Sequence, residues 1–89
     1  MQFMVIERFR ACARPVYERF GEQGRLLPDG LEFVASWVSA DLARVFQVME
    51  CDEITLLQRW VAGWEDIAEF EIVPVVPSGS PVADAVLGR

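Results

Sequence analysis

The stretch RVFQVMECDEITLLQRWVAGW, residues 44–64, changes its hydrophobic period halfway along, and this change constrains the fold more than any other feature. Its first half is rich in strand formers and is apolar on both faces, which is typical of a central strand. Its second half has an apolar stripe at helical spacing, made by Ile54, Leu57, Val61 and Trp64. We expect one helix over residues 53–65, with Asp52 as its N-cap.

The same patterns predict three further strands and one further helix. Residues 2–9, 31–38 and 69–76 have the composition of strands, and Pro74 places the last of them at a sheet edge because proline has no N–H to donate. Pro15 suits the first turn of a helix whose expected buried side consists of Val16, Tyr17 and Phe20. The link at residues 39–43 is too short for a helical crossover, so the second and third strands should form an antiparallel hairpin.

The predicted order is strand, helix, strand, strand, helix, strand, which is the split βαβ arrangement of the ferredoxin-like α+β fold. We expect a four-stranded sheet with the first and third strands as parallel neighbours at its centre and with two helices on one face. This domain should span residues 1–77, and residues 78–89 should form a C-terminal tail.

Composition predicts a partner for the other face of this sheet. Hydrophobic residues make up 53% of the 89 residues, which is more apolar surface than one small core can cover. The first and third strands are apolar on both sides, although the helices cover only one. We therefore expect a second copy to pack sheet to sheet, which gives a homodimer with the form of a dimeric α+β barrel.

The net charge of the chain limits which other partners it can bind. The chain has 14 acidic and 8 basic residues, a formal net charge of −6, and its cations do not cluster. We therefore expect no nucleic-acid partner and no membrane partner. Apolar runs are too short to span a bilayer, and charges within the first ten residues argue against a signal peptide. These features predict a cytoplasmic protein in which Cys12 and Cys51 are reduced.

The chain has no histidine and no lysine. Histidine general bases, histidine ligation of haem and the common histidine metal sites are thus excluded within this chain, as is lysine Schiff-base chemistry. The glycines form no phosphate-binding motif. We expect no metal and no cofactor.

Two sets of residues are candidates for a site. Glu7 and Glu50 should lie side by side if their strands are parallel, and adjacent carboxylates can serve as a catalytic acid and base; the alternative is that arginines or water neutralise them. An apolar ligand pocket could be walled by the aromatic residues Tyr17, Trp37, Trp60 and Trp64. The alternative places Trp60 and Trp64 in the core and Trp37 in a dimer contact.

The chain also contains the segments MQFMVIERF, PVYERF, LPDGLEFVASWV, RVFQVMECD, LLQRWVAGWED and FEIVPVV. Together, over about residues 1–77, they resemble an uncharacterised bacterial family known only as a domain of unknown function. The resemblance implies a dimeric α+β barrel but brings no catalytic residues with it. Wider relatives in fold include cofactor-free monooxygenases, isomerases, haem-degrading enzymes and ligand-binding modules, which is analogy at the level of fold.

Three functions follow as hypotheses. The one we favour is a non-catalytic homodimeric barrel that binds a small apolar or aromatic molecule or a protein partner. The second is a cofactor-independent oxygenase or isomerase in which Glu7 or Glu50 accepts a proton from a small organic substrate. The third is a structural assembly module.

Overall fold

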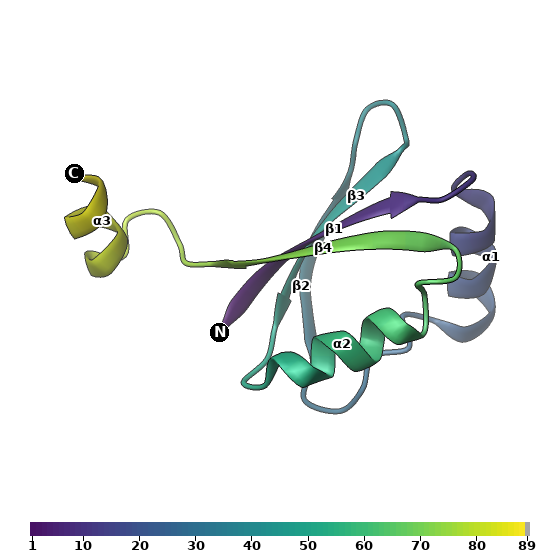
Figure 1. Cartoon of the computed structure of the whole chain (residues 1–89), viewed down its shortest axis with the longest axis horizontal. Helices are drawn as coiled ribbons and strands as arrows, with labels where there is room; N and C mark the ends of the chain where they lie inside the picture. The colour runs from purple at the N-terminus through teal and green to yellow at the C-terminus, as the bar shows by residue number, and fades with distance from the viewer. Residues whose placement is uncertain (89) are drawn as a thin grey trace.

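The computed structural model describes residues 1–88, without the side chains of residues 83 and 84. One open antiparallel sheet has the strand order β2-β3-β1-β4. Its strands are β1 (Gln2–Phe9), β2 (Glu32–Val38), β3 (Arg44–Glu50) and β4 (Ala68–Val75). Helices α1 (Arg14–Gln23) and α2 (Ile54–Ala62) lie on one side of the sheet, and α3 (Pro81–Leu87) follows β4 (Figure 1). The fold is therefore α+β.

Most of the predicted elements are confirmed, including the β2–β3 hairpin and the edge position of β4 with Pro74. The predicted limits of α2 are wrong. Glu53, not Asp52, occupies the N-cap position and makes no side-chain cap bond, and the helix ends at Ala62. Beyond it the N–H of Gly63 donates to the Trp60 carbonyl, and residues 63–67 continue in tight turns rather than as a regular helix.

The prediction that the two central strands are parallel is wrong. β1 and β3 are antiparallel neighbours, with Gln2 opposite Glu50 and Arg8 opposite Arg44. The physical reason lies in the connections: the crossover through α1 makes β2 run parallel to β1, and the hairpin then makes β3 run opposite to β2. A strand between two parallel strands can pair with both only by running against them.

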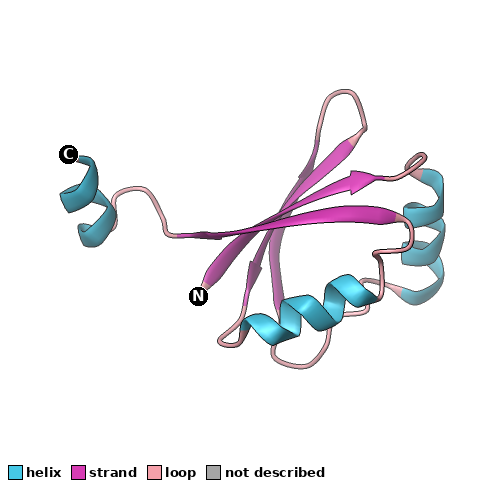
Figure 2. Ribbon diagram, in the orientation of Figure 1, coloured by secondary structure: helices cyan, strands magenta, loops and turns pink. Residues whose placement is uncertain are grey.

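The two faces of the sheet have different surroundings. Residues at one set of alternating positions, such as Phe3, Val5 and Met49, point toward the helices and are buried with Leu57 and Trp60. We call this the inner face. The opposite set forms the outer face, which α1 and α2 leave uncovered (Figure 2); its apolar members are Met4, Ile6, Ala35, Trp37, Phe46, Val48, Val73 and Val75.

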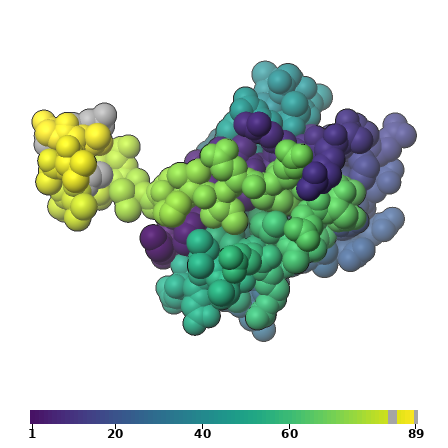
Figure 3. Space-filling model, viewed as in Figure 1, coloured from purple at the N-terminus to yellow at the C-terminus, as the bar shows by residue number. Residues whose placement is uncertain are grey.

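Both edges of the sheet are irregular. On β2 the pairing register shifts between Phe33 and Ala35, which is a β-bulge. On β4, Pro74 lies within the strand opposite Phe3. Past this edge strand α3 stands apart from the sheet and helices (Figure 3), and it carries exposed Val82, Val86 and Leu87. Arg89, the last residue of the predicted tail, lies outside the described residues.

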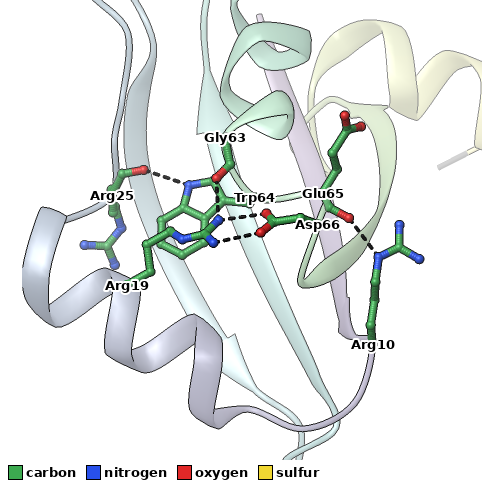
Figure 4. A network of polar contacts seen from close by, with 7 residues as sticks. All are labelled: Arg10, Arg19, Arg25, Gly63, Trp64, Glu65 and Asp66. Carbon is green, nitrogen blue, oxygen red and sulfur yellow. Dashed lines mark hydrogen bonds and ion pairs between the residues drawn. The ribbon is translucent and has the colours of Figure 1, made fainter.

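Polar contacts hold α1 against the end of α2 (Figure 4). The Arg19 guanidinium donates to both carboxylate oxygens of Asp66 and to the Gly63 carbonyl, each at 2.8 Å, and lies 5.7 Å from the Trp64 ring centroid. Val16 is the buried residue of α1, whereas Tyr17 and Phe20 are about half exposed, contrary to the prediction that all three form its buried side. The helix therefore stands off from the sheet.

Replacing Arg19 should loosen α1. We expect Arg19→Gln to lower the urea midpoint of unfolding and to speed hydrogen exchange of the α1 amides, because the variant loses the two-pronged contact with Asp66. Arg14→Gln is the matched control, since Arg14 is exposed on the same helix. Equal exchange rates in α1 for the two variants would contradict the anchoring role of Arg19.

Candidate functional site

A cavity of about 310 Å³ lies between the inner face of the sheet and the two helices. This volume falls within the range of small-molecule sites in proteins, which begins at roughly 300 Å³. The sheet, α1, α2 and the loop after α1 all contribute to its lining, which comprises Glu7, Val16, Tyr17, Phe20, Arg25, Ser36, Val38, Val45, Gln47, Trp60 and Trp64.

Two buried polar side chains form the floor of this cavity. Glu7 of β1 is 4% exposed and Gln47 of β3 is 6% exposed. Val5 is opposite Gln47 and Val45 is opposite Glu7, so the two polar side chains are diagonal neighbours on the inner face. Among the described side chains neither has a hydrogen-bond or ion-pair partner. No fully buried side-chain nitrogen or oxygen there lacks a partner, so the polar atoms of these two residues open onto the cavity, where they can bind water or another molecule.

Burial also changes the acidity of Glu7. Desolvation disfavours its charged form and raises the pKa of its carboxyl from 4.5 to about 7. Near neutral pH the group therefore exists in both protonation states. A carboxyl with this pKa can donate a proton to a bound molecule or accept one from it.

Tryptophans from α2 and the turn after it form one wall. The indole N–H groups of Trp60 and Trp64 both donate to the Arg25 carbonyl, at 2.9 Å and 3.1 Å (Figure 4 shows the second bond). Trp60 also meets Phe70 edge to face, with ring centroids 5.5 Å apart. Both tryptophans are buried, so they belong to the core and to the cavity wall at once.

The part of the lining formed by α1 and the loop after it is more open and carries a cation. Tyr17 and Phe20 of α1 are 51% and 41% exposed. The Arg25 guanidinium carbon lies 3.6 Å from the ring centroid of Phe33 and 5.0 Å from that of Phe20. Aromatic rings thus hold this cation beside the cavity.

The expected pairing of Glu7 with Glu50 is wrong. Glu50 lies opposite Gln2, at the other end of the β1–β3 pair from Glu7, and on the outer face of the sheet. The antiparallel direction of the two strands is the reason, because it separates positions that a parallel pairing would bring together.

Three of the four aromatic candidates, Tyr17, Trp60 and Trp64, line the cavity. The fourth, Trp37, lies on the outer face and is 57% exposed. Simple alternation puts Trp37 on the same face as Phe33, but the bulge between Phe33 and Ala35 moves Ala35 and Trp37 to the other face.

Sequence reasoning missed Arg25, Ser36 and Gln47 as lining residues. A polar residue among apolar neighbours in a central strand was the available signal for Gln47. Arg25 has no comparable signal, since a loop arginine is ordinarily a solvated residue. Among the side chains that the structure describes, no cluster of cysteine and acidic residues is arranged to hold a metal ion, and no described helix has the length and apolarity needed to cross a bilayer.

Raising the pH from about 5 to about 8 should destabilise the natural chain more than Glu7→Gln. The unfolded chain loses the Glu7 proton near its ordinary pKa of 4.5, whereas the folded chain keeps it up to about 7. Stability from this group is therefore fully present below pH 4.5 and is lost as pH rises through about 7. The difference amounts to at most about 3 kcal/mol. Urea unfolding of both proteins at the two pH values measures it, and an identical pH dependence would contradict it.

Comparison with known proteins identifies the family but no activity. The family model for a domain of unknown function, DUF3303, matches residues 1–84. Neither the curated proteins nor the solved structures contain a match to this chain. The matched segment is nearly the whole chain and includes every lining residue of the cavity; the chain therefore belongs to the DUF3303 family, whose function is unknown.

Proposed function

We propose that this protein binds a small, largely apolar or aromatic molecule in the cavity, without catalysing a reaction. The observation that carries this proposal is the pair of buried side chains, Glu7 and Gln47, that face the cavity without partners among the described residues. Their polar atoms open onto the cavity, so a ligand with matching polar groups can form hydrogen bonds with them directly. Apolar walls with a few convergent polar groups are typical of ligand sites.

A thermal-shift screen tests this proposal. Small aromatic acids, quinones and fatty acids are the probes, and we expect at least one to raise the melting temperature saturably, because a ligand that binds only the folded state stabilises it. Ser36→Phe should abolish the rise by filling the cavity from β2, whereas Ser36→Ala should preserve it. Glu50→Gln is a second control, since Glu50 lies on the outer face. No response to any probe, or an undiminished response in Ser36→Phe, would contradict the proposal.

A cofactor-independent oxygenase or isomerase is the second candidate, favoured by the raised pKa of Glu7. In this function Glu7 alone would accept the proton, because Glu50 is remote from it. Binding and turnover of a compound, measured in the natural chain and in Glu7→Gln, distinguish the binding function from the enzymatic one. A catalytic role requires turnover that this substitution removes while binding persists.

We further propose a ferredoxin-like fold and a homodimer that pairs the outer faces into an α+β barrel. The strand order supports the fold assignment. Charge on β2 and β3 supports self-pairing, because Arg44 lies at one end of their outer face, whereas Glu32 and Glu50 are partners at the other; Arg8 of β1 lies beside Arg44 but also opposite Glu69 of β4. A two-fold axis across the strands would place Arg44 of one copy over the acidic end of its partner. The free thiols of Cys12 and Cys51 and the resemblance to a bacterial family support a place in the bacterial cytoplasm.

Removing Trp37 should weaken this dimer. Buried interface tryptophans often contribute about 2 kcal/mol or more, so Trp37→Ala should raise the dimer dissociation constant by at least about tenfold. Phe20→Ala is the control, because Phe20 is an exposed aromatic residue on the helical side. Sedimentation equilibrium measures both variants, and a dimer as tight in Trp37→Ala as in the natural chain would contradict the interface.

A further inference from the structure

We propose that the ligand of the cavity is a planar organic anion whose carboxylate binds the Arg25 guanidinium. The inference rests on the proposed function and adds the chemical class of the ligand. It combines the position of Arg25, its missing counter-ion, and the polar groups on the sheet side of the cavity.

The position of Arg25 is fixed from two sides. Its carbonyl accepts both tryptophan indole N–H groups, which ties this part of the loop to the helical layer. Its guanidinium lies over the Phe33 ring and beside Phe20, a lining residue of the cavity. A guanidinium stacked in this way keeps the N–H groups at its edge available, and their planar fork matches the two oxygens of a carboxylate.

Arg25 has no counter-ion in the part of the chain that the structure describes. The ion pairs there are Arg10 with Glu69 and Arg19 with Asp66. Several other described arginines also lack an ion pair, but Arg25 is the arginine in the cavity lining. The acidic residue in the cavity lining is Glu7, and burial raises the pKa of its carboxyl to about 7, so protonated Glu7 leaves the cavity positively charged.

The remaining lining residues define the rest of the ligand. Flat aromatic surfaces from Tyr17, Phe20 and Trp60 suit a ring system. On the sheet side, Glu7 and Gln47 can exchange hydrogen bonds with a carbonyl or hydroxyl group of the ligand. One guanidinium matches one carboxylate, whereas phosphate esters carry more charge than this lining balances.

Calorimetric titration with naphthoate and with the neutral naphthamide tests the proposal on the natural chain. The two probes share their ring system and differ in charge, so no variant is needed for the first comparison. We expect naphthoate to bind at least about tenfold more tightly, as charge-assisted hydrogen bonds do relative to neutral ones. Equal affinity for the two probes would overturn the anion proposal and leave small-molecule binding intact. Failure of both probes to bind, together with a negative thermal-shift screen, would overturn the proposed function as well.

Variants of Arg25 test whether its guanidinium is the group that binds the carboxylate. Arg25→Gln should weaken naphthoate binding about tenfold while changing naphthamide affinity less than about twofold. Arg25→Lys keeps the charge without the planar fork and should give an intermediate loss. Arg14→Gln is the control, because Arg14 is an exposed arginine outside the cavity lining. An equal loss for both probes in Arg25→Gln would show that the arginine supports the cavity only by packing, and would overturn the proposal.

Discussion

One carbonyl oxygen, that of Arg25, accepts the indole N–H groups of both Trp60 and Trp64, and the helical side of the molecule depends on this junction. It satisfies two buried donors that would otherwise be costly. It also joins the loop after α1 to α2 and the turn that follows. The Arg19 contacts with Asp66 and Gly63 hold α1 to the same region, so the helices are braced against each other while space remains between α1 and the sheet.

The polar side chains on the sheet side of the cavity reduce the stability of the fold. Glu7 and Gln47 occupy inward positions at which apolar side chains would complete the core. In a domain of 89 residues the net stability is small, so polar side chains at two positions that face the core are a notable departure from apolar packing. Sites of binding and catalysis commonly account for such departures from the best packing. The floor of the cavity therefore has the character of a functional site rather than of a packing defect.

The sequence predicts the elements better than their directions and contacts. Local patterns are enough to predict the strands and the edge position of Pro74, and helical spacing is enough to predict that Trp60 is buried; Trp64 is buried as well, but from the turn after α2. The separation of Glu7 from Glu50 could be derived from the hairpin and the crossover taken together, because these connections fix strand direction. The position of Arg25 beside the cavity could not be derived from the sequence, since it depends on tertiary contacts of a loop. A single bulge likewise decides the face on which Trp37 lies.

The irregular edges have a consequence for how copies of this chain meet. An exposed edge strand can extend its hydrogen-bond ladder into another molecule without limit, which leads to fibrous aggregates. On one edge the bulge of β2 interrupts that ladder, and on the other Pro74 removes a donor while Glu69 and Glu71 add charge. Growth by strand addition is thus blocked in both directions, so the apolar outer face can remain exposed during folding with less risk of runaway polymerisation.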